Sequence, residues 1–402
     1  MKVLQVNVVY SNGSTGKIVK EIHNHLISDG YESIVCFGRG DESPENNVIK
    51  LAPEYIMKAQ SMRSKITGYA YSGCKFSTDK LIEIITKQAP DIVHLQCING
   101  YMVNIYRLLD FLKRKNIITV ITLHAEFMYT AGCSHAYDCE KWKSGCGHCP
   151  QKGNGRPSSK LFDRSAEEWN MMNNAFDSFE NLTIVSVSTW LNSRAKLSPF
   201  FIDKNIKVIL NGIDTNNIFK PTKTDSLKNK HRISDEKIIL HVTPNFNSEI
   251  KGGKHVLELA ERLKNERVKF IIVGYNADRE NLPSNIIPVG HTKNQEELAE
   301  YYSLADLTLL TSKAETFSMV TAESLACGTP VIGFKAGGPE SISIEEFSEF
   351  VEQGNSDKLY SVVKEWLGKN IDKNIIAKIG KERYSVEVMY KNYLDLYRGL
   401  IK

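Results

Sequence analysis

Residues 314–332 read Ala-Glu-Thr-Phe-Ser-Met-Val-Thr-Ala-Glu-Ser-Leu-Ala-Cys-Gly-Thr-Pro-Val-Ile. The apolar residues recur first at helical spacing and then in one short run, which predicts a helix from about Ser318 to Gly328 and a strand after it. The run Leu307–Leu310 predicts another strand before it. A helix that begins just beyond a strand directs unpaired N–H groups above the sheet edge, where a phosphate binds well.

Glu315 and Glu323 carry the two carboxylates of this stretch. Eight helical residues span about 12 Å at about 1.5 Å per residue, which exceeds the separation of roughly 5–9.5 Å that a glycosidase pair needs. The spacing favours two acids that bind opposite ends of one elongated ligand, such as a sugar and a ribose flanking a diphosphate. Two solvated acids at the ends of an ordinary amphipathic helix are the alternative.

The composition is that of a globular protein with room for two domains: 402 residues, 42% hydrophobic and 24% charged. A net charge of +4 gives no reason to expect a nucleic-acid partner. Residues 1–205 hold 24 Lys and Arg against 20 Asp and Glu, whereas the remainder has 27 of each. In the first half, segments 57–65 and 107–115 mix apolar and basic residues, which indicates either contact with an anionic membrane or ordinary solvated helix faces.

The sequence contains no run of about 18 apolar residues, and Met1–Asn7 lead into a strand without a signal peptide. We therefore expect a cytoplasmic protein, peripheral on the inner face of the cell membrane if the basic segments contact lipid. In that compartment the eight cysteines indicate thiols or metal ligands rather than disulfides.

The first half predicts a doubly wound α/β domain. Its apolar runs lack clean alternation, as in parallel strands that are covered on both faces, and helix-length stretches separate them. The predicted strands are 3–9, 33–37, 92–95, 117–123 and 183–187.

Two features follow the ends of these strands. Gly13 and Gly16 open a helix after the first strand but complete neither a P-loop nor a dinucleotide fingerprint. Such glycines allow N–H groups to approach an oxyanion or a sugar, so the turn is either part of a ligand cleft or only a tight turn. His124 follows the strand 117–123, where α/β proteins bind ligands, and is either functional or a packed or capping histidine.

Four cysteines lie within 17 residues, with His135 and His148 among them. They could form a structural zinc site, although the first spacing is wide for zinc; free or redox thiols and disulfides are the alternatives. The cysteines are Cys133, Cys139, Cys146 and Cys149.

The boundary between the halves falls near residues 206–214, and a polar stretch follows at 220–236. A second doubly wound sheet is predicted after it. Lys251 precedes Gly252 and Gly253 where a strand-to-helix loop should open, which suits either neutralisation of a diphosphate or an ordinary surface lysine. The predicted strands are 238–242, 270–274, 286–290, 307–310 and 331–334.

In combination, these residues resemble the retaining family 4 glycosyltransferases of the GT-B fold. The resemblance covers nearly the whole chain and rests on the pair Glu315 and Glu323, the sequences Lys251-Gly252 and Gly337-Gly338-Pro339-Glu340, His124, and the glycine turn at 13–16. The Cys-rich insert is similar to that of a subgroup linked to capsule, exopolysaccharide or lipopolysaccharide assembly.

The resemblance implies an α/β architecture with two Rossmann-like domains that face a central cleft. Residues 1–205, with the Cys-rich insert at 131–152, would bind the acceptor. Residues 206–384 would bind the nucleotide sugar, and a C-terminal helix at 385–402 would pack back on the first domain.

The resemblance also implies roles in binding the donor. Glu323 would bind the ribose and Glu315 the hydroxyl groups of the sugar. Gly290 and His291 would lie near the base. The diphosphate would be held by Lys251 and by the backbone N–H groups of Ser318, Met319 and Val320.

His124 would lie beside the transferring sugar, and Gly13 and Gly16 would match the N-terminal glycine loop of the family. Members usually need no metal, because fixed cations and helix dipoles stabilise the leaving diphosphate. The sequence departs from the pattern of this family at three places that concern diphosphate binding and the acceptor. Residues 243–247 lack the basic residue that is often found there, Ala125 stands where Asp is common, and residues 96–100 lack the histidines that are often seen there.

We therefore expect a retaining, hexosyltransferase-type enzyme of polysaccharide biosynthesis. It would transfer a sugar from a UDP- or GDP-sugar to a glycan or lipid-linked glycan, with no cofactor required for catalysis. A catalytically weak nucleotide-sugar-binding partner protein and a sugar-nucleotide epimerase of the same fold are the alternatives.

Overall fold

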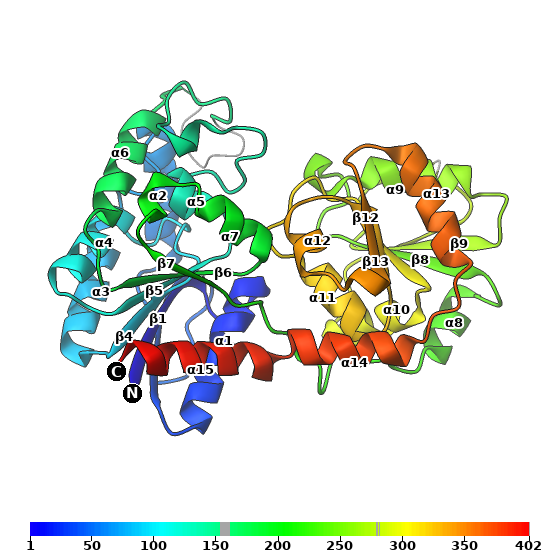
Figure 1. Ribbon diagram of the computed structural model, residues 1–402, viewed down its shortest axis with the longest axis horizontal. Helices are drawn as coiled ribbons and strands as arrows, with labels where there is room; N and C mark the ends of the chain where they lie inside the picture. The colour runs from blue at the N-terminus through cyan, green and yellow to red at the C-terminus, as the bar shows by residue number, and fades with distance from the viewer. Residues whose placement is uncertain (153–160, 279, 281, 402) are drawn as a thin grey trace. The chain divides into compact units, whose positions relative to one another are not determined.

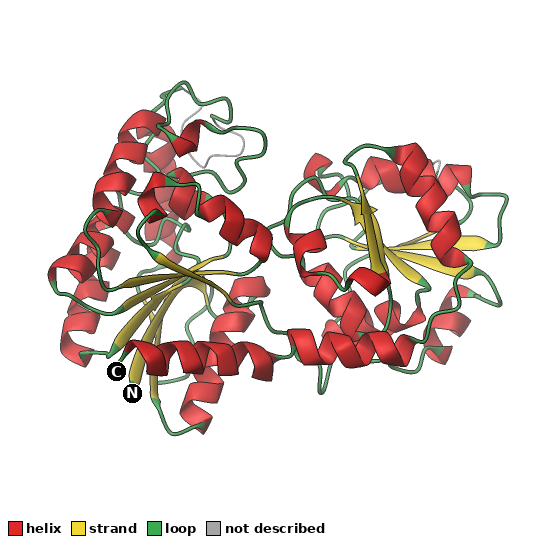
Figure 2. Ribbon diagram, viewed as in Figure 1, coloured by secondary structure: helices red, strands yellow, loops and turns green. Residues whose placement is uncertain are grey.

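The computed structural model describes residues 1–152, 161–278, 280 and 282–401 (Figure 1). The chain divides into two compact units, Met1–Leu210 with Tyr390–Lys402, and Asn211–Met389. Both changes of unit lie five residues after the boundaries expected from the sequence, 205/206 and 384/385. Each unit consists of a parallel sheet with helices on both faces (Figure 2).

The first unit contains a seven-stranded sheet in the order β3-β2-β1-β4-β5-β6-β7, in which all paired neighbours are parallel. The strands are β1 (Lys2–Val9), β2 (Glu32–Arg39), β3 (Val48–Lys50), β4 (Ile92–Leu95), β5 (Thr119–Leu123), β6 (Leu182–Ser186) and β7 (Asn205–Val208). The α-helices are α1 (Gly13–Ser28), α2 (Glu54–Thr67), α3 (Lys75–Gln88), α4 (Ile105–Arg114), α5 (Phe127–Thr130), α6 (Ser165–Phe176), α7 (Thr189–Ala195) and most of α15 (Val386–Leu400).

The second unit contains a six-stranded parallel sheet in the order β10-β9-β8-β11-β12-β13. Its strands are β8 (Lys237–Val242), β9 (Val268–Val273), β10 (Ile286–Val289), β11 (Leu307–Leu310), β12 (Val331–Phe334) and β13 (Ser348–Val351). Its α-helices are α8 (Asp225–His231), α9 (Gly253–Arg262), α10 (Gln295–Leu304), α11 (Met319–Ala326), α12 (Gly338–Ile342), α13 (Ser356–Leu367) and α14 (Lys373–Tyr384).

The central strands are buried along their length because helices cover both faces of each sheet. Every residue of β4, β5, β6, β11 and β12 is buried, which explains why their sequences do not alternate between apolar and polar residues. The prediction of two doubly wound α/β domains is confirmed.

Both sheets contain a point at which the strand order reverses. In the first unit the chain proceeds from β1 to β2 and β3 on one side and then returns to β4 on the other side of β1. In the second unit β8 and β11 are related in the same way. The loops after the two adjacent strands leave in opposite directions at such a point, and the crevice between them is where open α/β sheets bind ligands.

Helix α15 is fixed to the first unit by buried hydrogen bonds. His94 on β4 is bonded through Nδ1 to the hydroxyl of Tyr397 at 2.7 Å and through Nε2 to Thr122 Oγ1 at 2.8 Å. Thr122 is also bonded to the hydroxyl of Tyr393 at 2.9 Å. All four side chains are at most 1% exposed, so the C-terminal segment supplies partners to polar groups inside the sheet.

The segment 107–115, which the sequence offered as a membrane contact, is an ordinary surface helix. Its residues Leu108, Leu109 and Leu112 are fully buried in the core. Its cations point outward, and Arg107 and Arg114 pair with acids of α3 and α4. None of the helices in the described part of the chain has the length and apolar character needed to cross a bilayer.

Lowering the pH should destabilise the first unit through His94. Burial, with a smaller effect of His124, lowers the pKa of His94 to about 3, whereas a histidine of the unfolded chain titrates near 6.5. The folded state keeps His94 neutral, so the stability that depends on neutral His94 is complete above about pH 6.5 and is lost as the pH falls toward 3. Between pH 7 and pH 5 we expect His94 to remove on the order of 1–2 kcal/mol from the free energy of unfolding.

Urea unfolding at each pH, followed by tryptophan fluorescence, measures this effect, because Trp142, Trp169 and Trp190 all lie in the first unit. The variant His94→Gln keeps a polar side chain beside Thr122 and Tyr397 but cannot be protonated. Its stability should therefore decrease less between pH 7 and pH 5. Parallel pH profiles for the variant and the wild type would refute the assignment.

Candidate functional site

The strongest candidate site lies at the carboxyl edge of the second sheet, where β8 and β11 are neighbours. Lys251 is in the loop after β8 and Glu315 in the loop after β11, and Lys251 Nζ lies 2.5 Å from Glu315 Oε1. The side chains are 26% and 20% exposed, so the pair is accessible from solvent. The structure therefore brings together two predicted site residues that are 64 positions apart in the sequence.

Backbone contacts fix the loop that carries Lys251. Thr311 Oγ1 donates to the carbonyl of Lys251 at 2.9 Å, and the N–H of Lys313 donates to the carbonyl of Ile250 at 2.7 Å. Gly252 has φ +68°, and a Cβ there would lie 2.1 Å from the carbonyl oxygen of Thr311. Only glycine allows this approach, so the sequence Lys251-Gly252 positions the ammonium group beside the β11 loop.

Glu315 is held by the loop after β12. Its N–H donates to the carbonyl of Ala336 at 2.9 Å, and its carbonyl accepts from the N–H of Gly338 at 2.8 Å. Gly337 has φ +102°, and Glu340 accepts hydrogen bonds from the N–H groups of Ala336 and Gly337 at 3.0 and 2.8 Å. Glu340 therefore acts on Glu315 through the backbone, a role that the sequence motif alone does not reveal.

Helix α11 begins directly after this loop. Ser318, its N-cap residue, has φ +81°, and its Oγ accepts from the N–H of Thr321 at 3.2 Å. Met319 and Val320 form the first turn, whose N–H groups have no acceptor within a helix. The start of α11 thus provides N–H donors and the positive end of a helix dipole in the loop region of Glu315.

Glu323 lies further along α11 and is only 8% exposed. Its Oε2 accepts a hydrogen bond from the hydroxyl of Tyr302, on α10, at 2.9 Å. Burial and the neighbouring carboxylate raise the pKa of Tyr302 well above its usual value, so this hydroxyl remains a donor. No local sequence pattern indicates Tyr302 as the partner of Glu323.

Gly290 and His291 follow β10, two strands from β8 along the same carboxyl edge. The carbonyl of Gly290 accepts from the N–H of Gly274 at 3.1 Å. A Cβ at Gly274 would lie 1.7 Å from the carbonyl oxygen of Thr243. The ends of β8, β9 and β10 are therefore packed directly against one another.

In the first unit, Gly13 and Gly16 lie at the reversal point between β1 and β4. Gly13 begins α1 with φ +64°, and a Cβ at Gly16 would lie 3.1 Å from Val9 Cγ2. The loop after β4 is tied to β1, since Asn7 Oδ1 accepts from the N–H of Cys97 at 2.9 Å. The glycine turn therefore lies on the β1 side of this reversal point.

His124 follows β5 in the first unit and is half-buried. Its Nε2 is bonded to Gln96 Oε1 at 3.0 Å, and Gln96 in turn donates to Gln5 Oε1 at 2.8 Å. Gln5 and Gln96 are fully buried, and this chain of amides fixes the ring. Burial lowers the pKa of His124 to about 4, so the ring is neutral at pH 7 and acts as a hydrogen-bonding group rather than a cation.

The structure does not support the predicted zinc site. Across residues 1–152, 161–278, 280 and 282–401, no group of three or more His, Cys, Asp or Glu side chains is arranged to hold a metal ion. Cys133 is buried, and Cys146 Sγ lies 3.8 Å from the carbonyl of Thr130. Close spacing in sequence therefore did not place Cys133, Cys139, Cys146 and Cys149 around a common point.

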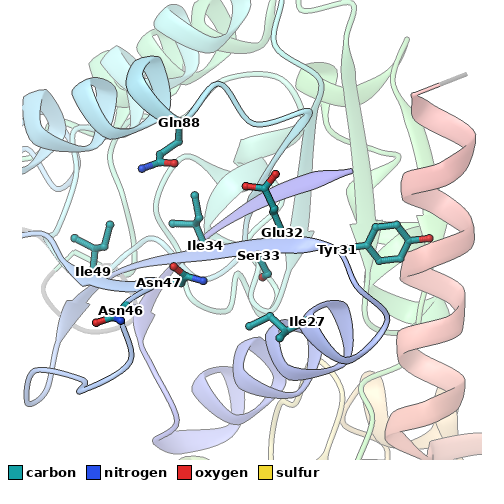
Figure 3. Close-up of a pocket in the computed structure, with 9 residues that line it drawn as sticks. All are labelled: Ile27, Tyr31, Glu32, Ser33, Ile34, Asn46, Asn47, Ile49 and Gln88. Atoms are coloured by element: carbon teal, nitrogen blue, oxygen red, sulfur yellow. The ribbon is translucent and has the colours of Figure 1, made fainter.

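The first unit also contains a pocket (Figure 3). It has a volume of about 240 Å³ and is located where β2 and β3 begin, at the edge opposite to the carboxyl ends of the strands. Its walls carry amides, one carboxylate and isoleucines: Ile27, Tyr31, Glu32, Ser33, Ile34, Asn46, Asn47, Ile49 and Gln88. No predicted site residue lines it.

The second-unit site is suited to an anion that carries neighbouring hydroxyl groups. A fixed ammonium group and helical N–H groups can bind a diphosphate, and carboxylates can accept hydrogen bonds from sugar hydroxyls.

The chain is similar to several known proteins. Residues 223–383 match the family described as "Glycosyl transferases group 1". Over 428 aligned positions the chain is 20% identical to the Escherichia coli K12 protein named "Putative colanic acid biosynthesis glycosyl transferase WcaC", with all of both chains covered. It is 26% identical to the N-acetyl-alpha-D-glucosaminyl L-malate synthase of Bacillus anthracis over 58% of this chain and 63% of that protein.

Solved structures match nearly the whole chain at low identity. The Anabaena protein Alr3699/HepE in complex with UDP has a TM-score of 0.68 at 15% identity, over 99% of this chain and 100% of the other. Sucrose-phosphate synthase from Thermosynechococcus elongatus has a TM-score of 0.68 at 17% identity, over 100% and 99%. Residues 223–383, which contain Lys251, Glu315 and Glu323, thus match the group 1 glycosyltransferases, and the chain as a whole has the GT-B fold of two Rossmann-like domains.

Proposed function

We propose that the protein is a retaining glycosyltransferase that transfers a sugar from a UDP- or GDP-sugar to a hydroxyl group of a glycan or lipid-linked glycan in polysaccharide biosynthesis. The observation that carries this proposal is the contact between Lys251 and Glu315 at the strand-order reversal of a unit that matches group 1 glycosyltransferases. The name of the E. coli relative refers to colanic acid biosynthesis, and Alr3699/HepE has been solved with UDP-glucose. The first supports a role in polysaccharide biosynthesis, and the second supports a sugar nucleotide as the donor.

Lys251 and the first turn of α11 are proposed to bind the diphosphate. Lys251 contacts Glu315 at 2.5 Å, and a diphosphate would compete for the same ammonium group. Its binding would leave Glu315 able to accept hydrogen bonds from the sugar hydroxyls. Negative charge builds on the diphosphate as the glycosidic bond breaks, and fixed positive groups stabilise that state more than the ground state.

The remaining donor contacts follow from the same arrangement. Glu323, oriented by Tyr302, would accept hydrogen bonds from the ribose, and Gly290 and His291 would contact the base. In the first unit, Gly13 and Gly16 would leave space for substrate. His124, with its neutral ring, would form a hydrogen bond with the transferring sugar. We place the reaction in the cytoplasm, where sugar nucleotides are available.

The experiment that tests the transferase proposal is a screen of UDP- and GDP-sugars for thermal stabilisation, followed by a transfer assay with the donor that stabilises most. The glycosidic product should have the anomeric configuration of the donor, which NMR determines. An inverted product would refute retention. Binding without turnover in every acceptor mixture would favour the nucleotide-sugar-binding partner protein instead.

Replacing Lys251 with Met should weaken binding of the free nucleoside diphosphate about tenfold or more, because a charge-assisted hydrogen bond contributes roughly 1.5–3 kcal/mol. Isothermal titration calorimetry measures the affinity. The matched control is Lys254→Met, which removes an exposed lysine from the first turn of α9 and should leave the affinity unchanged. Equal losses in both variants would mean that Lys251 has no specific role.

Replacing Glu315 with Gln should separate sugar transfer from nucleotide binding. The change removes the carboxylate that competes for Lys251, so the affinity for free nucleoside diphosphate should stay the same or increase. Transfer should decrease about 100-fold, since Glu315 is proposed to act on the sugar. If nucleotide affinity falls while kcat is preserved, Glu315 binds the nucleotide and not the sugar.

The ribose role of Glu323 can be tested with a deoxy ligand. The wild type should bind the ribonucleotide about tenfold more tightly than its 2′-deoxy or 3′-deoxy analogue, and Glu323→Gln should lose that preference. Glu296→Gln, an exposed change on α10, serves as the control and should keep it. A variant that still discriminates against both deoxy analogues would exclude a contact between Glu323 and the ribose.

A further inference from the structure

Helix α2 of the first unit exposes an apolar stripe. Tyr55, Met62 and Ile66 are 71%, 58% and 61% exposed, and Ala59 between them is also exposed. These residues occupy positions i, i+4, i+7 and i+11, which lie on one face of a helix. The opposite face buries only Met57 and Ser64, so the larger part of the apolar surface of α2 points away from the protein.

The apolar side chains of the α2 stripe point to solvent, whereas those of α4, the other segment with mixed apolar and basic residues, point into the core. Helix α4 buries Leu108, Leu109 and Leu112 and directs its charges to solvent, as an ordinary surface helix does. The two segments look alike in sequence, and only the structure distinguishes them.

Cations flank the apolar stripe of α2. Lys58 and Lys65 lie on one side of it, Arg63 lies on the other, and all three are exposed. In the part of the chain that the structure describes, none of the three forms an ion pair with a carboxylate. The acid of this helix, Glu54, is paired with Arg39 at 2.8 Å. The outer face of α2 is therefore both apolar and positively charged.

Two further exposed aromatic residues adjoin α2. Phe76, at the start of α3, is 62% exposed, and its turn is bonded to α2 through Cys74 N–H and Gln60 Oε1 at 3.1 Å. Phe162 is 50% exposed and lies against Gly68, where a Cβ would be 3.2 Å from Phe162 Cβ. We call Tyr55, Lys58, Met62, Arg63, Lys65, Ile66, Phe76 and Phe162 the α2 face.

The inner side of α2 is fixed to the unit. The helix ends at Gly68 with φ +83°, and the buried Glu168 then accepts hydrogen bonds from the N–H groups of Ala70 and Tyr71 at 2.7 and 3.1 Å. The connection to α3 is therefore anchored in the core. The α2 face is presented by a fixed helix and requires no refolding to be exposed.

We propose that the α2 face binds the surface of an anionic lipid bilayer, with α2 lying in the plane of the headgroups. An exposed apolar stripe between cations has the chemistry of an interfacial helix, whose apolar side enters the acyl boundary while lysines contact anionic headgroups. The exposed lysines and arginine of the α2 face are complementary in charge to anionic headgroups. The positive charge also disfavours a second copy of the same face. The proposal depends on this surface alone and is independent of the transferase activity.

The test is sedimentation of the whole protein with phosphatidylcholine vesicles that either contain or lack phosphatidylglycerol, with no nucleotide or acceptor present. We expect binding to the anionic vesicles, weakened by added salt, and much weaker binding to the neutral ones. The double variants Met62→Ser/Ile66→Ser and Lys58→Glu/Lys65→Glu should each lower the affinity for anionic vesicles about tenfold or more.

Matched controls lie elsewhere on the same unit. Leu197→Ser/Ile202→Ser removes two apolar side chains that are 53% and 70% exposed, and Lys87→Glu/Lys115→Glu makes the same charge change at two other exposed lysines; both should bind vesicles as the wild type does. Circular dichroism checks that every variant is folded. Equal binding to neutral vesicles, or unchanged binding by both double variants, would overturn the proposal. So would loss of self-association on size-exclusion chromatography without loss of vesicle binding, which would identify the α2 face as a contact between copies.

Discussion

The contact between Lys251 and Glu315 depends on one constraint, the reversal of strand order between β8 and β11. Parallel strands place all their following loops at one edge, and the reversal sends two neighbouring loops apart over opposite faces of the sheet. The side chains of Lys251, in the loop after β8, and Glu315, in the loop after β11, contact each other beyond the ends of these two strands. Hydrogen bonds stabilise both loops around this contact. Thr311 donates to the carbonyl of Lys251, and Glu340 accepts from the N–H of Gly337 in the loop that contacts Glu315.

Three glycines allow close backbone packing at the carboxyl edge of the second sheet. At Gly252, Gly274 and Gly333 a Cβ would lie 2.1, 1.7 and 2.0 Å from a carbonyl oxygen of a neighbouring loop or strand. These positions cannot accept side chains, so the strand ends and their loops pack against one another directly through the backbone.

Much of this architecture could be predicted from the sequence because buried parallel strands have an unmistakable composition. The central strands and α11 were predicted close to their observed bounds. The short edge strands β3, β7 and β13 were missed, because residues such as those of β7 are largely exposed and carry no apolar run. Long-range partners such as Tyr302 for Glu323 and Gln96 for His124 could not be predicted, since no local pattern encodes them. The cysteine cluster failed as a zinc prediction for the same reason: spacing along a loop does not determine where the loop places its thiols.

The attachment of α15 has a consequence for how the molecule is made. His94 and Thr122 are buried in the first sheet, and their hydroxyl partners Tyr393 and Tyr397 belong to a segment that is synthesised about 270 to 300 residues later. During translation residues 1–210 emerge before the second unit, yet they retain buried polar groups without these partners until residues 393–397 arrive. The second unit lies wholly within the intervening sequence and can close beforehand. The ribosome therefore begins the first unit before the second but completes the first unit only after the whole second unit has been synthesised.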